Sequence, residues 1–563
     1  MDSFLEESME KWVVTAKRAD FYAIAERFHI DPVTARVIRN RDIVGDDAIA
    51  EYLYGDLSSL RDPLELKDMD LARDILLRKI REGKKIRIIG DYDIDGVMSS
   101  YILKTGIARL GGRADIRIPN RMSDGYGINE RLIREAYEDE TDTILTCDNG
   151  ISADQPLRYA KSLGMTAVVT DHHEVTVIPE ADAVVDPKRP DDQSVNKNLC
   201  GGAVAWKLIR AMGGDPDSSL LQFAAFATVG DVMDLTGENR IIVKEGIRQL
   251  RETDNPGLRA LAQVTGTDLG RLGAWQIGFI LGPCLNASGR LDTAMRAEML
   301  LESPDIKSAM PIAEELKSLN ESRKSMTESG VAEAEAVIES SGLADDRVLV
   351  VYLPDVHESI AGIIAGRLRE SRNRPAIVLT RGESAVKGSG RSVPGYSMFE
   401  ELVRAEDLLI RYGGHPMAAG LSLKEEQIGA LRERLNGNCV LTEEDMIPRV
   451  RIDVPMPVSY VTEKLIRELS LLEPFGRGND SPLFGDPDVI CRNPRLIGSA
   501  KNVLKMQVRH ADSPVFLDAI AFRNAEELYE RAVSSPRMKI AYEPQINEYM
   551  GTRSIQIVIS HFQ

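Results

Sequence analysis

Three short segments of the sequence gather side chains that bind divalent cations. DYDIDG (residues 91–96) places three carboxylates at alternate positions, CDNG (147–150) adds a fourth, and DHHE (171–174) joins an acid to two adjacent histidines. Carboxylates crowded into one loop are unfavourable unless cations neutralise them. The residues concerned are Asp91, Asp93, Asp95, Asp148, Asp171, His172 and His173.

This ligand set is rich in oxygen, with one or two imidazoles and no thiolate, which suits Mn²⁺ or Mg²⁺ better than structural zinc. The number of ligands predicts two ions. A pair of divalent ions ~4 Å apart can activate water and stabilise a leaving oxygen at phosphorus. Each acid also has an ordinary alternative role, as a helix cap or a turn residue, but three such clusters in one sheet favour a metal centre. We therefore expect hydrolysis of a phosphoester or phosphoanhydride.

Each cluster directly follows a predicted strand. The strands are KKIRIIG (84–90), TDTILT (141–146) and TAVVT (166–170), and helix-like segments cover residues 97–112 and 155–164. This β-loop-α-β order predicts an open parallel sheet. Ligands bind such sheets outside the carboxyl ends of the strands, so the three clusters should converge on one rim.

The rest of the chain predicts several further units, since 563 residues exceed the usual size of one domain. We expect short helical segments over residues 1–50, the catalytic α/β domain over 51–305, a helical connector over 306–340, a second α/β lobe over 341–445 and a β-barrel of the OB type over 446–563. The expected fold class is α/β, with a parallel-sheet domain and a second α/β lobe joined by a long helix, and a C-terminal barrel.

Composition narrows the function classes. The net charge of -18 argues against a polycation that coats nucleic acid or membrane. Five scattered cysteines without a CxxC pair favour neither a thiolate zinc site nor a disulfide framework, which fits a reducing cytoplasm. The N-terminal segment lacks an apolar signal core, and no stretch of ~18 apolar residues occurs. We expect no export and no membrane span.

The order and spacing of DYDIDG, CDNG and DHHE resemble the DHH phosphoesterase superfamily. The later segments ATVGDVMDL, NASGRL, GSGRS, GGHPMAAG and LLEPFGRGNDSPLF are similar to the RecJ family of single-stranded-DNA-specific exonucleases, over about residues 45 to 563. The resemblance implies a DHH domain, a DHH-associated domain and an OB domain.

Matched residue by residue, the resemblance implies five metal ligands, with Asp148 bridging the two ions: Asp93, Asp95, Asp148, His172 and Asp231. It gives Asp91 and Asp171 supporting roles and places His173 next to the scissile phosphate. Without the family pattern, Asp231 in VGDV could equally be an ordinary turn residue.

The same resemblance implies substrate contacts outside the metal centre. Arg121 and Tyr126 match positions near the 5′ end of bound DNA, where guanidinium can hold phosphate and an aromatic ring can stack on a base. Ser389 and Arg391 match the 5′-phosphate pocket, and the further matched contacts are Asn286, Arg290 and His415. The alternative to a substrate contact is a solvated surface loop for Arg121 and Tyr126, and a tight turn or a helix cap for the other residues. The segment VHESIAGIIAGRL (356–368) departs from the family pattern on both sides of its histidine.

The resemblance implies a metal-dependent exonuclease that degrades single-stranded DNA from its 5′ end to 5′-mononucleotides in DNA repair and recombination. Single-strand-binding protein and a RecQ-type helicase are partners expected at the family level. Lys501, Lys505 and Arg509 alternate along a predicted barrel strand and could follow a DNA backbone or form a solvated strand face. Two alternatives are a DHH phosphoesterase of short oligonucleotides or cyclic dinucleotides, and a non-catalytic nucleic-acid-binding scaffold. The complete ligand set argues against the scaffold.

Overall fold

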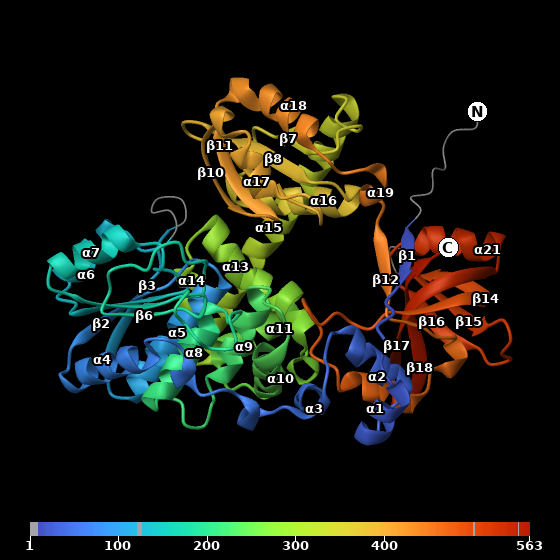
Figure 1. Cartoon of the computed structure of the whole chain (residues 1–563), viewed down its shortest axis with the longest axis horizontal. Coiled ribbons are helices and arrows are strands. Elements are labelled where there is room, and N and C mark those ends of the chain that lie inside the picture. The colour runs from blue at the N-terminus through green and yellow to red at the C-terminus, as the bar shows by residue number, and fades with distance from the viewer. Residues whose placement is uncertain (1–9, 121–126, 499–500, 550) are drawn as a thin grey trace. The chain divides into compact units, whose positions relative to one another are not determined.

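The computed structural model of the chain describes residues 10–120, 127–498, 501–549 and 551–563. Arg121 and Tyr126 lie outside the described residues. The chain forms two compact units (Figure 1). The smaller unit comprises Met1–Lys11, Pro256–Thr265 and Pro283–Arg449, and the larger unit comprises Trp12–Asn255, Gly266–Gly282 and Val450–Gln563.

A five-stranded parallel sheet organises the first part of the larger unit. Its strands are β2 (Lys85–Ile89), β3 (Arg113–Arg117), β4 (Thr143–Cys147), β5 (Thr166–Thr170) and β6 (Ala183–Val185), in the order β3-β2-β4-β5-β6. All neighbouring pairs are parallel. The order of the strands reverses between β2 and β4, and such a switch point is where open α/β sheets bind ligands.

Helices pack against this sheet through their apolar faces: α4 (Met69–Arg81), α5 (Ile94–Arg109), α6 (Glu130–Glu138), α7 (Asp154–Ser162) and α8 (Gly201–Met212). Helix α9 (Leu221–Gly230) packs on α5 and α8, α10 (Gly237–Leu250) packs on α9, and the short α12 (Ala274–Gln276) follows later in the chain. The α9 sequence, LQFAAFATVG, is apolar nearly all round, and the helix is accordingly buried. A π-helical turn, Ile277–Leu281, continues α12.

The second part of the larger unit is a closed barrel. Its strands are β14 (Phe484–Ile497), β15 (Val503–His510), β16 (Leu517–Ala521), β17 (Arg537–Tyr549) and β18 (Thr552–Phe562), and α21 (Ala525–Ser534) precedes β17. The order β14-β15-β16-β18-β17 is closed by pairing of β14 with β17. Short strands β12 (Arg449–Ile452) and β13 (Val454–Pro455) and helix α20 (Glu463–Ser470) lead into it, and β12 pairs with β1 (Lys11–Val14).

The three N-terminal helices share the hydrophobic core of the barrel. These helices are α1 (Phe21–Phe28), α2 (Pro32–Asn40) and α3 (Asp46–Tyr54). Ile38 and Leu53 belong to the same buried cluster as Leu465 and Phe484. The backbone N–H of Asp31 also donates to Glu468 Oε2 at 2.5 Å. Two ends of the sequence therefore fold together.

The smaller unit contains a long helix and a mixed sheet. Its helices are α11 (Pro256–Thr265), α13 (Gly282–Leu291), α14 (Met295–Leu301), α15 (Ile306–Ser340), α16 (Glu358–Arg372), α17 (Met398–Val403), α18 (Ile428–Asn438) and α19 (Glu443–Met446). Its strands are β7 (Leu349–Tyr352), β8 (Ala376–Arg381), β9 (Val386–Arg391), β10 (Leu409–His415) and β11 (Ala418–Leu423), in the order β10-β11-β9-β8-β7. Only the β7–β8 pair is parallel within this sheet.

These elements confirm the predicted fold class: a parallel α/β sheet, a second α/β lobe with a long helix, and a C-terminal OB-type barrel. Helix α15 covers the range expected for the connector. Among the described residues, no helix combines the length and the hydropathy that crossing a membrane requires.

Candidate metal centre and anion pocket

The carboxyl ends of β2, β4 and β5 bring the three predicted clusters together in the larger unit. Three groups of potential ligands occur here, and within each group the ligand atoms lie within 4.8 Å of one another: Asp91 with Asp93 and Asp148, Asp95 with His172 and Asp231, and Asp148 with His172 and His173. Asp148 and His172 each belong to two groups, so the groups form one continuous centre. The centre lies at the switch point of the sheet, where topology predicts it.

The loop after β2 is held by hydrogen bonds from helix N-termini. Asp93 caps α5 and accepts from the backbone N–H groups of Asp95 (2.9 Å) and Gly96 (3.2 Å). Asp95 accepts from the N–H groups of Gly201 and Gly202, both at 2.7 Å, at the start of α8. An added Cβ on Gly201 would lie 2.8 Å from the Asp148 Cβ. Glycine therefore allows α8 to approach the acidic cluster.

The loop after β4 is held in an unusual backbone conformation. Asp148 has a φ of 59°, in the left-handed region. The next side chain, Asn149, is completely buried, and its Nδ2 donates to the carbonyls of Ile89 (3.0 Å) and Cys147 (2.9 Å). Asn149 thereby ties the end of β2 to the end of β4. This contact fixes the Asp148 carboxylate relative to the β2 loop.

His172 reaches into the carboxylates from the end of β5. Its Nε2 lies 3.0 Å from Asp148 Oδ1, 3.4 Å from Asp95 Oδ2 and 3.7 Å from Asp231 Oδ2. Burial, followed by the charge of His173, lowers the pKa of His172 to about 3. The ring is therefore neutral near pH 7, and the neutral form is the one that binds metals.

His173 is in the opposite protonation state. Its Nδ1 lies 2.8 Å from Asp171 Oδ1, and 42% of its side chain is exposed. Burial opposes the charged form, but the hydrogen bond to Asp171 and the surrounding carboxylates outweigh it and raise the pKa of His173 to about 9. Asp171 also accepts from the backbone N–H groups of His172 and Ile151. The imidazolium of His173 is therefore held at the rim of the centre.

The acids of the centre repel one another strongly. Burial raises the pKa of Asp148 well above its ordinary value, and Asp95 and Asp93 raise it further. Burial and neighbouring acids also raise the pKa of Asp95 to about 6 and that of Asp231 to about 8. Divalent cations would relieve this repulsion. Carboxylate oxygens with an imidazole nitrogen also form a donor set that fits Mn²⁺ or Mg²⁺.

The structure brings Asp231, which sequence alone leaves ambiguous, into the centre as the C-cap of α9. The following residue, Val232, has a φ of 55°, which is uncommon for a β-branched side chain and recurs at functional sites. Asp91, for which the resemblance implies a supporting role, lies close enough to Asp93 and Asp148 to act as a ligand.

Sequence reasoning missed four residues that position or polarise the centre: Asn149, Lys188, Gly201 and Gly202. The Nζ of Lys188 lies 3.1 Å from Glu174 Oε1, and its charge lowers the pKa of His172 and opposes the rise at Asp231. No local pattern identifies Lys188. Asn149 was visible in CDNG, and the paired glycines follow Cys200, but their partners lie far away in the sequence.

A second candidate site lies in the smaller unit, on β9. Arg391 donates to Ser389 Oγ at 3.0 Å and to the Gly390 carbonyl at 2.8 Å. Burial and the charge of Arg369 lower the pKa of Arg391. Within the described part of the chain, no carboxylate forms an ion pair with Arg391. A half-buried guanidinium without a carboxylate partner is suited to an anion.

The other predicted contacts of this unit lie around α16 and β9. The Arg290 guanidinium donates to the Ser359 carbonyl at 3.0 Å, in the first turn of α16. Gly362, one turn later, packs against Ser389 and Arg391. The exposed His415 pairs with Ala418, which pairs with Arg391, so all three occupy one row of the sheet. Asn286 lies on α13, one turn before Arg290.

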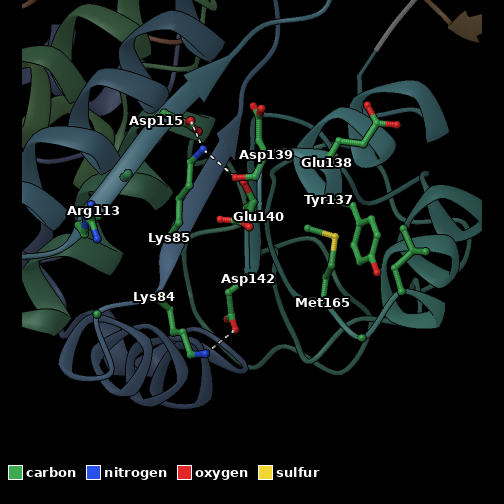
Figure 2. A pocket seen from close by; sticks show the side chains of 15 residues that line it. Lys84, Lys85, Arg113, Asp115, Tyr137, Glu138, Asp139, Glu140, Asp142 and Met165 are labelled. Atoms are coloured by element: carbon green, nitrogen blue, oxygen red, sulfur yellow. Dashed lines mark hydrogen bonds and ion pairs between the residues drawn. The ribbon is translucent and has the colours of Figure 1, made fainter.

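A cavity of about 1060 Å³ lies at the opposite edge of the parallel sheet, where the strands begin (Figure 2). Its charged side chains are largely paired: Lys85 lies 3.3 Å from Asp115, and Lys84 lies 3.6 Å from Asp142. No proposed metal ligand lines this cavity. The candidate chemistry is therefore at the carboxyl edge, where the groups of potential metal ligands lie.

Comparison with known proteins finds three family models that match separate parts of the chain. The family model of the DHH family, N-terminal domain, matches residues 85–230, the DHHA1 domain matches 345–440, and the RecJ OB domain matches 452–561. The single-stranded-DNA-specific exonuclease RecJ of Bacillus subtilis is 37% identical over 542 residues, covering 95% of this chain and 68% of the relative. The Escherichia coli RecJ is 33% identical, covering 88% of this chain and 90% of the relative.

The fold matches a solved relative over nearly the whole chain. The crystal structure of RecJ from Thermus thermophilus in complex with Mn²⁺ superimposes with a TM-score of 0.84 at 28% identity, covering 99% of this chain and 80% of that one. Its complex with Mg²⁺ gives 0.77 at 27% identity, covering 98% and 78%. The sequence identities, their coverage and this structural match together show that the chain belongs to the RecJ family.

Proposed function

We propose that the protein is a metal-dependent exonuclease that hydrolyses single-stranded DNA from the 5′ end to 5′-mononucleotides, in DNA repair and recombination. The observation that carries the proposal is the centre in which Asp148 is shared between two groups of ligands at the switch point of the sheet. Membership of the RecJ family, whose named relatives are single-stranded-DNA-specific exonucleases, supplies the substrate class.

The proposed ion-binding residues form two sets. One set comprises Asp91, Asp93 and Asp148, and the other comprises Asp95, His172 and Asp231. The proposed bridge between them is Asp148, because its Oδ1 lies 3.0 Å from His172 Nε2. Mn²⁺ and Mg²⁺ are the proposed ions because the Thermus relative was solved with each. When bound, two such ions supply a nucleophilic water and stabilise the leaving oxygen.

The protein's own groups have separate proposed roles. The Asp171 carboxylate holds the proton-bearing Nδ1 of His173, so that a positive charge faces the phosphate being cleaved. Arg391 and Ser389 bind the 5′ phosphate through charge-assisted and hydroxyl hydrogen bonds. Arg290, Asn286 and His415 are proposed substrate contacts in the same unit. Arg121 and Tyr126 keep the proposed role at the 5′ end.

The barrel is the proposed holder of the downstream strand. Arg492 lies over the Phe516 ring at 3.6 Å and Arg509 lies 5.6 Å from the same ring centroid. This cluster offers cations and an aromatic surface together, as single-strand-binding barrels do. Lys505 lies on β15 with Arg509, and Lys501 lies two residues before the first residue of this strand.

We also propose domain limits and a cellular setting. The limits are those expected from sequence: 1–50, 51–305, 306–340, 341–445 and 446–563. The proposed compartment is the cytoplasm, where five free, buried cysteines are compatible with reducing conditions. A RecQ-type helicase would supply single strands and single-strand-binding protein would coat them. Both proposed partners are supported by the proposed substrate, because one produces single-stranded DNA and the other binds it.

The test is cleavage of DNA labelled at either end in the presence of Mn²⁺. A 5′-labelled single strand should release its label at once as a mononucleotide, whereas a 3′-labelled strand should shorten progressively. Blunt duplex and circular single strands should resist, and chelator should stop the reaction. Cutting of circles, or early release of a 3′ label, would show a different nuclease activity.

A further inference from the structure

Helix α10 carries a row of basic side chains that few acids neutralise. Arg240, Lys244, Arg248 and Arg251 recur every three or four residues, so they share one side of the helix and of the residue that follows it. Arg240 is buried and donates to the carbonyls of Leu471 and Glu473. Burial, followed by the charge of Arg240, lowers the pKa of Lys244. Among the described residues, neither Lys244 nor Arg251 forms an ion pair with a carboxylate.

Three of these cations, Lys244, Arg248 and Arg251, line a cavity of about 440 Å³ in the larger unit. Its lining also includes Trp275 and residues 470, 471 and 473–475. The two acids of the lining are Glu245, which binds Arg248 at 3.0 Å, and Glu473. The lining therefore carries one more cation than anion. A concave surface with excess positive charge favours an anionic ligand.

Beside the cavity, two aromatic rings are turned towards solvent. Trp275 is 60% exposed and Phe279 is 66% exposed. Their ring centroids lie 5.8 Å apart with an interplanar angle of 25°, so they form a nearly parallel pair. The π-helical turn Ile277–Leu281 sets this spacing along the helix, and such turns are frequent at functional sites. Exposed, stacked rings are a surface on which bases can stack.

The cavity has a definite place relative to the metal centre and the barrel. Helix α10 starts six residues after Asp231 and extends for about 20 Å, with the cavity along its second half. Residues 470–475 lead into the barrel, and Arg271, just before the aromatic pair, lies 3.8 Å from Glu548 of β17. The cavity is therefore lined both by the helix that follows Asp231 and by the segment that leads to the barrel.

We propose that Lys244, Arg248 and Arg251 of the basic row and the Trp275–Phe279 pair form a second binding site for single-stranded DNA, which holds the strand at a distance from the metal centre. Arg248 and Arg251 contact phosphates, and a base stacks on Trp275. This inference rests on the proposed function. An acidic peptide would also suit the cations, but the solvent-facing ring pair and the regular row of charges favour a strand with repeating phosphates and flat bases.

The experiment measures the affinity of the full chain for 5′-phosphorylated oligothymidylates of graded length, in metal-free buffer. The variants are the double substitution Arg248→Ala with Arg251→Ala, and Trp275→Leu. The matched controls are Arg78→Ala with Arg81→Ala, at the end of α4, and Tyr22→Leu, whose ring is 78% exposed. Thermal melting checks that each variant is folded.

We expect each test variant to weaken binding of long strands by roughly tenfold, with the loss appearing only once the strand is long enough to reach the cavity. The double variant should also reduce the salt slope by about 1.4, or ~0.7 for each phosphate contact. Trp275→Phe should restore most of the affinity lost in Trp275→Leu, because it keeps a stacking ring. The controls should bind as the unaltered protein does.

Three outcomes separate the explanations. If the affinity of both test variants for DNA depends on strand length and on salt as it does in the wild type, the inference fails. The proposed function still stands in that case, provided that the wild type cleaves single strands. Absence of Mn²⁺-dependent cleavage by the wild type would instead overturn the proposed function. If the variants keep their affinity for DNA but lose binding of the peptide Asp-Asp-Asp-Gly-Phe, the cavity is a peptide site and the inference fails.

Discussion

Asp148 is a residue at which folding and the proposed chemistry make opposite demands. Its carboxylate is buried among other acids in a left-handed backbone conformation, which costs stability. Its place between two ligand groups is what would hold two ions together. This conflict is typical of functional sites and makes the effects of substitution separable.

Asp148→Asn should raise the melting temperature in chelator, because it removes a charge that repels Asp95 and Asp93, yet lower turnover by roughly 100-fold or more. The upward shift of the melting temperature on adding Mn²⁺ should shrink. Calorimetry with and without Mn²⁺ measures the two melting effects, and a single-strand cleavage assay measures turnover. Asp142→Asn is the control, since Asp142 is paired with Lys79 at 2.6 Å and its loss should destabilise the protein. Near-normal turnover would remove Asp148 from the mechanism.

Gly362 is the other residue whose position constrains a site. A Cβ there would lie 2.7 Å from Ser389 Oγ and 2.8 Å from an Arg391 guanidinium nitrogen. Gly362→Ala should displace the guanidinium and reduce the preference for a 5′ phosphate over a 5′ hydroxyl by roughly tenfold, mainly through KM. Gly366→Ala, one turn later with open space around it, should keep the preference. If Gly362→Ala and Gly366→Ala prefer a 5′ phosphate over a 5′ hydroxyl to the same extent, Ser389 and Arg391 do not form the 5′-phosphate pocket.

The convergence of Asp91, Asp93, Asp95 and Asp148 on one centre could be predicted from sequence, because these acids follow apolar strands and parallel strands end at one edge. Their supports could not be predicted in the same way. Gly201 and Gly202 act on Asp95 across more than 100 residues, and only the placement of α8 reveals that contact. Lys188 likewise gains its influence from folding alone.

At the scale of elements, β2 shows how a buried charge is tolerated in a parallel strand. Arg87 is 1% exposed and donates to Asp115 of β3, directly opposite in register, and to Asp139. Sequence patterning predicts β2 as a strand despite this arginine, because the surrounding isoleucines are apolar. It does not predict the partner of the charge, since pairing depends on register.

Asp115→Asn should lower the free energy of unfolding at pH 7 by about 1 kcal/mol, because a buried guanidinium loses a charged partner while Asp115 remains a third exposed. Arg87 and Lys85 outweigh burial and hold the pKa of Asp115 below its ordinary value. The stabilisation is therefore present above the unfolded pKa of ~4 and is lost as pH falls through the folded value.

Urea unfolding at pH 7, 5 and 3.5 measures the difference between the wild type and Asp115→Asn. The difference should be constant between pH 7 and 5 and should shrink at pH 3.5. Asp74→Asn, which breaks an exposed pair with Arg73, is the control and should change little. If the difference in unfolding free energy between the wild type and Asp115→Asn increases as the pH falls, the predicted pH dependence is wrong.

At the scale of the whole molecule, the barrel is not an independently folded domain, because it shares its hydrophobic core with the N-terminal helices. The fold class followed from strand and helix patterns, but the packing of α1–α3 against the barrel did not, because an apolar helix face does not specify what will cover it. The N-terminal helices carry Ile38 and Leu53 into the core that Phe484 and Leu465 complete. Removing the barrel would therefore uncover these helices.

A chain ending at residue 449 should bind a hydrophobic dye and aggregate, whereas a chain of residues 56–449, which also lacks α1–α3, should do so less. Dye fluorescence and light scattering compare the two, and the Mn²⁺-dependent melting shift reports whether the metal centre survives. The centre should survive in the shorter chain, since every proposed metal ligand lies between Asp91 and Asp231. A monomeric 1–449 chain with no dye binding would refute the shared core.

The contact between Asp31 and Glu468 spans 437 residues, and this separation has a consequence during synthesis. At about 5–20 residues per second, a ribosome takes roughly 20 to 90 s to make the intervening chain. Throughout that interval the apolar faces of α1–α3 have emerged while their covering surface does not yet exist. The nascent chain should therefore depend on a chaperone that shields its first helices, and slowing translation should prolong that dependence.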